Sequence, residues 1–422
     1  MIILSFGQEL YTSDVEQMRG VLITAKFEIA QTIESADLII LHANGKGDLH
    51  DFWATLTDLE KNHPNKSKII SGCIPKGDSD RINKYTLVTT RQIHKIAEAV
   101  EETLVDNVIQ LLNTKELPPI NLPRVRTVAY TQTIPIARAC QGTCGYCKSK
   151  RKGSPYTSYP IADIKNEVEK AIMLGAKEII LATSDGGAYG LDIKTNLPTL
   201  LRELIKIEGD YIIHLPKICP TTILKCKDDL TSVLKSDKLR KFLEFPMYSI
   251  SQSVLEDMGK TYNTEDFVNW VTTLKERFPT INIILDILVG HPLESDQDFW
   301  QLQTTLRKMS PDIIHTMQYN PKLRVQKDAK EILPLSDEEL GRRMVVLIDL
   351  NNNISKLQNE RWRDWVGSVI IEKEVREGVM QGRNFTYKPV HINTTTAKRG
   401  DILNVKVTRT TGTELLAEVV GN

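Results

Sequence analysis

The sequence predicts an α/β protein with a small N-terminal α/β domain, a central partial (β/α)6 barrel and a small C-terminal β-barrel. Three observations lead to this prediction. Apolar strand patterns alternate with helical patterns at the start of the chain, six strand patterns each followed by a helix or turn occupy the centre, and short strand patterns separated by turn residues end it. A chain of 422 residues is long enough for two or three domains.

The first domain is predicted over residues 1–115, where the alternation is typical of a parallel sheet. Its strand patterns are Ile2–Phe6, Asp37–Leu41 and Lys68–Ile70, and its helical patterns are Ser13–Phe27, Leu49–Asn62 and Gln92–Val105. The proline-rich stretch Leu117–Pro123 then predicts an extended linker, because proline fixes its own backbone and restricts the residue before it.

The barrel is predicted over residues 126–325. Its six strand patterns are Thr127–Ala137, Glu178–Thr183, Tyr211–Ile218, Phe242–Met247, Ile281–Val289 and Ile313–Tyr319. Helical patterns between them are Ile161–Leu174, Leu197–Ile207, Thr264–Arg277 and Asp296–Met309. In barrels of parallel strands the functional residues gather at the carboxyl ends of the strands, so we expect the active site there.

A helical bridge is predicted over residues 326–361, and a small β-barrel over residues 362–422. The five strand patterns of this last segment are Val366–Lys373, Gly378–Arg383, Tyr387–His391, Asp401–Thr408 and Glu414–Val419. Small barrels of this kind bind RNA. Arg383, Phe385, Tyr387 and Lys388 offer cations and rings for unpaired bases, although a core position is as good an interpretation of either ring.

The most specific motif is C-x3-C-x2-C, formed by Cys140, Cys144 and Cys147 directly after the first barrel strand. Thiolates are the usual protein ligands of iron–sulfur clusters. Three of them hold one [4Fe-4S] cluster and leave one iron open for S-adenosylmethionine, as in the radical SAM enzymes whose motif this run resembles. A zinc site would need a fourth ligand at ordinary spacing, and none follows closely.

Polar and glycine-rich turns follow two other barrel strands. Ser184, Asp185 and Gly186 come after the second strand and are predicted to approach the methionyl amino group of the cofactor. Asp286 lies in the fifth strand pattern, and Gly290 follows it with a sharp exit that suits passage beside the adenine. An ordinary strand-to-helix turn is the alternative for both.

Cys219 follows the third barrel strand, where its thiol can face the pocket. It is a candidate catalytic residue as a radical quencher, a sulfur or methyl carrier, or a replacement cluster ligand. The alternative is a small core residue, which is common for buried cysteine.

Whole-chain charge says little about partners, because 54 Lys and Arg balance 54 Asp and Glu. Locally, Lys148, Lys150, Arg151 and Lys152 follow the last cluster cysteine and are predicted to meet RNA phosphates, although a solvated loop has the same composition. Six cysteines, three of them clustered, favour a reducing compartment over a disulfide framework. We expect a cytoplasmic protein, since no secretion signal or long apolar run is present.

Taken together, the chain resembles the radical SAM methylthiotransferase family, and within it the archaeal and eukaryotic branch that acts on tRNA. The matching runs are Ile134–Cys140, Ser158–Pro160, Asp185–Asp192, Thr195–Pro198 and Asp286–Pro292. The resemblance implies that a sulfur and then a methyl group are added at carbon 2 of N6-threonylcarbamoyladenosine in the anticodon arm. It also implies an electron donor, and a terminal RNA-binding barrel of the TRAM type.

The chain departs from this family at the cysteines of the first domain, which in the family hold an auxiliary cluster. Gln8 and Asn44 stand at the first two positions, and only Cys73 remains. Neutral amide oxygens are poor ligands for iron–sulfur clusters, so we expect no ordinary second cluster. Sulfur would then come from an external donor. The alternatives are a different, sulfur-free radical modification of a tRNA base, and a noncatalytic RNA-binding scaffold, against which the intact cluster motif argues.

A second departure lies in the turn after the fourth barrel strand. Ile250 stands where the family has glycine, and a β-branched residue does not easily adopt positive φ. The substrate side of the pocket is therefore predicted to be remodelled.

Overall fold

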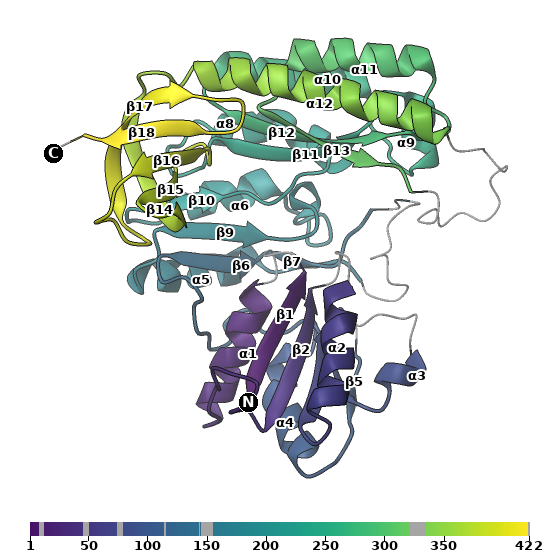
Figure 1. Ribbon diagram of the computed structural model, residues 1–422, viewed down its shortest axis with the longest axis vertical. Coiled ribbons are helices and arrows are strands. Elements are labelled where there is room, and N and C mark those ends of the chain that lie inside the picture. Colours follow the sequence, from purple (N-terminus) through teal and green to yellow (C-terminus); the bar gives the residue numbers. More distant parts are fainter. Residues whose placement is uncertain are drawn as a thin grey trace. The chain divides into compact units, whose positions relative to one another are not determined.

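The computed structural model describes residues 1–7, 12–44, 50–73, 79–113, 115–142, 144, 155–320 and 335–420 (Figure 1). The chain divides into two compact units. The first comprises residues 1–140 and 148–183, and the second comprises residues 141–147 and 184–422.

The first unit begins with a five-stranded parallel sheet in the order β1-β2-β3-β4-β5. Its strands are β1 (Ile2–Gly7), β2 (Leu38–Asn44), β3 (Ser67–Gly72), β4 (Thr86–Thr89) and β5 (Gln110–Leu111). Its helices are α1 (Thr12–Thr24), α2 (His50–Asn62), α3 (Ser79–Ile82), the 3-10 turn η2 (Ile93–Lys95) and α4 (Ile96–Leu104). The predicted α/β domain is confirmed, with two additional short strands, β4 and β5.

Alternate residues of β2 enter two different hydrophobic clusters. Leu38 and Ile40 pack with Met18 of α1, whereas Ile39 and Leu41 pack with Phe52 of α2. Successive side chains of a strand point to opposite faces, so the sheet is covered by helices on both faces. This explains why the strand pattern is continuously apolar.

The same unit contains the first two barrel strands, β6 (Thr131–Pro135) and β9 (Glu178–Ala182), which pair in parallel. Helix α5 (Ile161–Met173) connects them, preceded by the short strands β7 (Ala137–Arg138) and β8 (Thr157–Ser158). Arg138 forms a buried ion pair with Asp14 of α1, with Nη1 2.8 Å from Oδ1. The segment that leads into the cysteine motif is therefore held against the first domain.

The second unit contains the remaining barrel strands β10 (Ile212–His214), β11 (Phe242–Tyr248), β12 (Asn282–Val289) and β13 (Ile313–Gln318). The last three form a parallel sheet in the order β11-β12-β13. Their connections include the turns η3 (Gly186–Ala188) and η4 (Leu224–Cys226) and the helices α6 (Leu197–Leu204), α7 (Pro220–Ile223), α8 (Lys227–Val233), α9 (Gln252–Asp257), α10 (Thr264–Arg277) and α11 (Asp296–Met309). The third strand is shorter than predicted, since Pro216 lacks the backbone donor that a strand needs.

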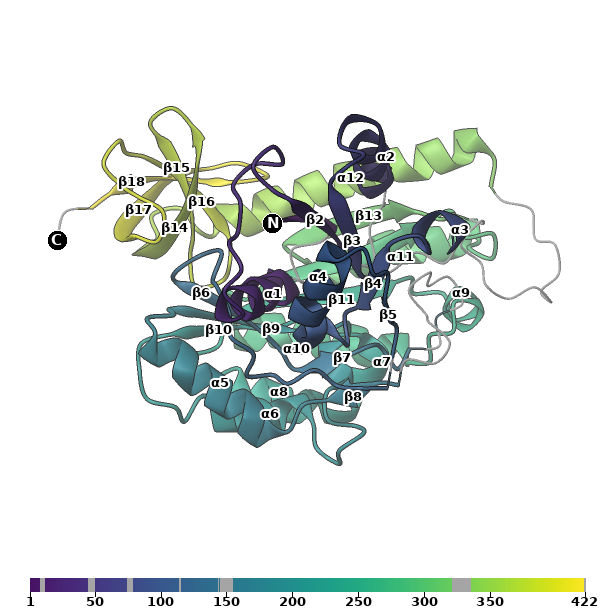
Figure 2. The same ribbon diagram turned by 90° about the horizontal axis from the view of Figure 1, so that it is seen from below.

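The ends of the helices follow their capping residues. The Ser295 hydroxyl accepts from the backbone N–H of Asp298, whose carboxylate accepts from Ser295 in return, so α11 begins with a capping box. Ser336 caps α12 (Asp337–Glu360) by accepting from the backbone N–H of Glu339. Helix α12 is the predicted bridge, and Figures 1 and 2 show it leading into the C-terminal barrel.

The C-terminal segment is a closed barrel in the order β14-β15-β16-β18-β17, as the sequence predicts for a TRAM-like module. Its strands are β14 (Val366–Arg376), β15 (Val379–Arg383), β16 (Pro389–Asn393), β17 (Ile402–Thr410) and β18 (Leu415–Val419). Inward residues such as Val369, Val390 and Val405 form its core. We propose domain boundaries near residues 115, 126, 325 and 362.

The carboxylate of Asp312, just before β13, links the parts of the second unit. Its oxygens lie 2.8 Å from Lys275 Nζ of α10, 3.0 Å from Lys388 Nζ of the module and 3.6 Å from Arg361 Nη2 at the end of α12. The side chain is fully buried. Burial raises the pKa of Asp312, but the charges of Lys388 and Lys275 outweigh it, and the net pKa is lowered.

Replacing Asp312 with alanine should therefore lower the free energy of unfolding by about 3–5 kcal/mol, because it leaves the ammonium groups of Lys275 and Lys388 buried without their anion. Urea denaturation followed by tryptophan fluorescence measures the change. The control is Lys406→Ala, which removes an exposed ion pair with Asp364 and should cost less than about 1 kcal/mol. Equal losses in the two variants would contradict the central role of Asp312.

Candidate active site

The structure describes two of the three predicted cluster ligands. Cys140 is exposed and follows Ala139, whose φ of 68° lies in the left-handed region and turns the chain after β7. Cys144 is half-buried. Cysteines at this spacing fit a cluster that binds by thiolates. Cys147 lies outside the described residues, as do Lys148, Lys150, Arg151 and Lys152.

Asp185 is buried and joins the glycine-rich turn after β9 to the start of α7 by hydrogen bonds. Its Oδ1 accepts from the backbone N–H groups of Gly187 and Cys219, each at 3.0 Å, and its Oδ2 accepts from Thr222 Oγ1 at 3.0 Å. Burial raises the pKa of this carboxyl group. The structure thus gives Asp185 a positioning role, whereas the sequence predicts a cofactor contact. Ser184, beside it, is only half-buried.

The two glycines of this turn are required by close packing. A Cβ on Gly186 would lie 2.7 Å from Pro216 Cγ, and a Cβ on Gly187 would lie 2.3 Å from Thr222 Oγ1. Both distances are shorter than nonbonded atoms tolerate, so η3 and α7 can approach each other only because side chains are absent.

Cys219 caps the N-terminus of α7 and pairs with a lysine that the sequence analysis missed. Lys260 is only 5% exposed, and its Nζ donates to Cys219 Sγ at 3.2 Å. The same Nζ lies 5.1 Å from the centre of the Tyr248 ring. Burial works against the charged lysine, but the charges of Cys219, Cys144 and Tyr248 outweigh it and raise the pKa of Lys260. Burial also raises the pKa of the Cys219 thiol, which Lys260 opposes.

The turn after β11 differs from the expectation for Ile250. Among the described residues with positive φ, the one in this turn is Tyr248, at 66°. The change from glycine to Ile250 therefore does not strain the backbone at that position. The left-handed Tyr248 instead carries the ring that packs on Lys260.

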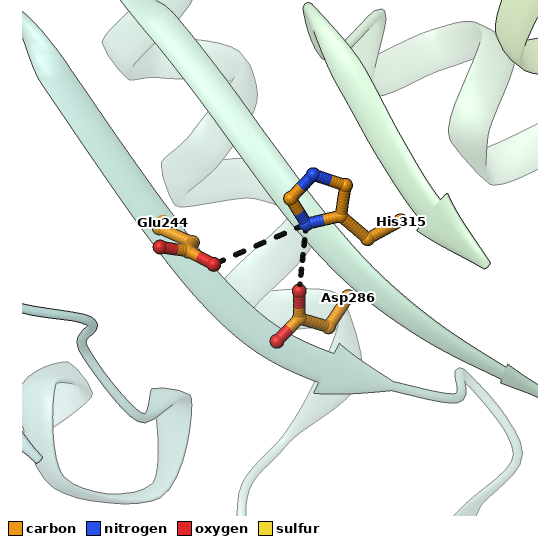
Figure 3. Close-up of side chains that lie close together, drawn as sticks. All are labelled: Glu244, Asp286 and His315. Atoms are coloured by element: carbon orange, nitrogen blue, oxygen red, sulfur yellow. Dashed lines mark hydrogen bonds and ion pairs between the residues drawn. The ribbon is translucent and has the colours of Figure 1, made fainter. Parts of the chain in front are cut away.

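A second cluster of titratable groups lies on three neighbouring strands (Figure 3). Glu244 of β11, Asp286 of β12 and His315 of β13 each offer one atom within 4.8 Å of the others, a spacing that can hold a metal ion. Lys217 Nζ, however, lies 2.7 Å from both carboxylates. His315 Nδ1 is 3.2 Å from Asp286 Oδ1. The side chains therefore neutralise one another as an internal charge network.

Asp286 belongs to this network, although the sequence predicts a cofactor contact. Burial raises its pKa, but the hydrogen bond with His315 and the charge of Lys217 outweigh burial, so the net pKa is lowered. Gly290, the other residue predicted at this strand end, has φ of 85°. A Cβ there would lie 2.5 Å from Leu340 Cδ1, so Gly290 allows the strand to pack against α12.

The structure corrects the expectation for Lys388, which is 4% exposed and pairs with Asp312 instead of facing solvent. Tyr387 packs on His214 and Phe242, with ring centres 4.5 Å and 5.2 Å away. Arg383 pairs with Glu372 at 3.0 Å. These three residues of the module therefore make internal contacts.

Phe385 is 38% exposed and lies against Trp362 and Trp365, so part of its ring remains accessible. The exposed cations of the module include Lys373, Arg376, Lys398, Arg399 and Arg409.

Comparison with known proteins decides the superfamily. Residues 134–306 match the model of the radical SAM superfamily. This match, which includes the cysteine motif, identifies a radical SAM domain in the chain. The chain is 28% identical, over 98% of both chains, to a probable threonylcarbamoyladenosine tRNA methylthiotransferase of Methanothermobacter thermautotrophicus. It is 31% identical to the threonylcarbamoyladenosine tRNA methylthiotransferase of Danio rerio, over 75% of this chain and 60% of that relative.

Solved radical SAM structures share the fold. The methyltransferase TsrM of Kitasatospora setae aligns over 75% of this chain and 72% of its own, with a TM-score of 0.55 and 12% identity. The cobalamin-dependent enzyme OxsB aligns over 83% of this chain and 55% of its own, with a TM-score of 0.52 and 12% identity. These structures confirm the predicted fold. The radical SAM match confirms the enzyme class and its cofactors, a [4Fe-4S] cluster with S-adenosylmethionine.

Membrane insertion finds no support in the described part of this radical SAM enzyme, where each helix is too short or too polar for a crossing.

Lys217→Met should lower the free energy of unfolding by about 1–2 kcal/mol near neutral pH, because Glu244 and Asp286 would then repel each other at a partly exposed site. Asp286 has a lowered folded pKa, so its contribution is present above its unfolded pKa and is lost as pH falls through the folded value. The deficit of the variant should therefore shrink below about pH 4. Urea denaturation across this range is the test, with Lys225→Met on the surface as control. A deficit independent of pH would refute the network.

Proposed function

We propose that this chain is a radical SAM transferase that modifies N6-threonylcarbamoyladenosine in the anticodon arm of tRNA. The observation that carries the proposal is similarity over 98% of the chain to relatives named for that substrate, together with the C-x3-C-x2-C motif. The product that we propose is the 2-methylthio derivative.

Cys140, Cys144 and Cys147 are the proposed ligands of the cluster. A cluster held by these thiolates would supply the electron for reductive cleavage of bound S-adenosylmethionine. The chain's own residues shape the surroundings: Asp185 holds the glycine-rich turn against α7, and Lys260 places a buried positive charge near Cys144.

The source of sulfur is the open step of this proposal. In the first domain, Gln8 and Asn44 replace cysteines that family members carry, and their side chains lie outside the described residues. Cys73 is half-buried. We propose that an ordinary auxiliary cluster is lacking and that an external donor supplies the sulfur. The same replacements favour a second candidate, a radical modification of the base without sulfur.

Mass spectrometry of tRNA nucleosides from cells with and without the gene distinguishes the two candidates. Loss of a 2-methylthio nucleoside supports the first, loss of another modified nucleoside supports the second, and an unchanged nucleoside profile contradicts both. Iron content after anaerobic reconstitution adds a separate measure: about four irons per chain correspond to one cluster and about eight to two.

Cys144→Ala should abolish formation of 5′-deoxyadenosine by the reconstituted enzyme, because two thiolates do not hold the cluster. Chromatography of the nucleoside product after addition of dithionite and S-adenosylmethionine measures this. Cys226→Ala is the matched control, since Cys226 is also half-buried but lies outside the motif. Undiminished cleavage by Cys144→Ala would be incompatible with its role as a ligand.

The exposed cations of the module are better candidates for RNA contacts than Lys388. The double variant Lys398→Glu and Arg399→Glu should weaken tRNA binding and reduce the slope of log affinity against log salt by about 2, roughly one for each lost phosphate contact. Filter binding at several salt concentrations measures both quantities. The control changes Arg307 and Lys308, exposed on α11, in the same way. The same loss in both double variants would argue against a specific role of the module.

A further inference from the structure

Lys260 is a buried cation whose hydrogen-bonding partner is a sulfur atom. Its side chain is 5% exposed, and the hydrogen bond that its ammonium group makes in the described part of the chain goes to Cys219 Sγ. A buried ammonium group is costly unless a negative group lies beside it. Cys219 Sγ, 3.2 Å from Lys260 Nζ, is placed to supply that charge when the thiol loses its proton, and Lys260 opposes the effect of burial, which raises the pKa of the thiol.

The backbone of Cys219 is held in place. Its N–H donates to Asp185 Oδ1 at 3.0 Å, and the residue directly precedes α7. Cys219 as a whole is half-buried. Cys226 offers a comparison within the same unit. Burial raises the pKa of both thiols, but the charge of Lys260 opposes this rise at Cys219, whereas the charge of Asp229 adds to it at Cys226.

We propose that Cys219 is a persulfide site that receives one sulfane sulfur from a persulfide donor. The Cys219 thiolate attacks the outer sulfur of the donor, R–S–SH. A new S–S bond forms on Cys219, the S–S bond of the donor breaks, and its electron pair leaves with the inner sulfur as R–S⁻. Cys219 then carries S–SH, and no external oxidant or reductant is consumed. The ammonium group of Lys260 stabilises the attacking thiolate and the persulfide anion that follows.

This inference rests on the proposed function, because a sulfur-inserting enzyme with one of the three family cysteines in its first domain needs sulfur from another place. A carrier beside Lys260, in the unit that contains Cys144, meets that need with residues of the chain itself. If the reaction inserts no sulfur, a persulfide on Cys219 has no role in it.

The test is to treat the reconstituted enzyme with inorganic polysulfide, block all thiols with iodoacetamide under denaturing conditions and map added sulfur atoms by peptide mass spectrometry. We expect sulfane sulfur on Cys219 at a level roughly tenfold above Cys226, since reactivity follows the thiolate. Lys260→Met should lower labelling of Cys219 by roughly the same factor, and Lys260→Arg should restore it. Equal labelling of the two cysteines, or labelling unaffected by Lys260→Met, would overturn the proposal.

Activity of Cys219→Ser separates this inference from the proposed function. Persistent cleavage of S-adenosylmethionine with loss of the methylthio product supports a carrier. A methylthio product made by Cys219→Ser at the normal rate refutes the carrier and leaves the proposed function intact. Labelling of Cys219 in an enzyme that modifies no tRNA refutes the proposed function and retains the persulfide site.

Discussion

The carboxylate of Asp312 is the interaction on which the arrangement of the second unit depends. A fully buried anion is stable only when cations compensate it, and here they come from separate elements: Lys275 from α10, Arg361 from the end of α12 and Lys388 from the module. The three contacts share one anion, so they link the module, α10 and the end of α12 through a single buried side chain.

The regular elements could be predicted because their signals are local. The alternation of apolar residues places the strands, and capping residues such as Ser295 place helix ends. The cysteine motif is equally local. Strands β4 and β5 are too short to show a period, and β10 is cut by Pro216, whose effect on pairing depends on its neighbours. The fold class was thus accessible from sequence, whereas the lengths of the shortest strands were not.

The contacts of polar side chains could not be predicted from the sequence. The same polar and aromatic residue types occur on RNA-binding surfaces and at buried contacts between helices and strands. Lys388 and Tyr387 have the residue types of an RNA-binding surface, yet they lie inward against Asp312 and His214. Asp286 is predicted to contact the cofactor, yet it lies within β12 and joins a charge network with Lys217 and His315. Its partner Lys217 comes from a segment 69 residues away, and no local pattern records such a pairing. Lys260 was missed for the same reason.

Asp185 connects the glycine-rich turn to Cys219 by hydrogen bonds. One oxygen of this carboxylate accepts from the backbone of both Gly187 and Cys219, so the position of the turn sets the position of the thiol. Thr222 can reach the second oxygen only because Gly187 has no side chain. The turn that the sequence predicts to contact the cofactor and the thiol at which we infer sulfur chemistry are therefore positioned by the same carboxylate. A substitution that moves the turn should also move Cys219.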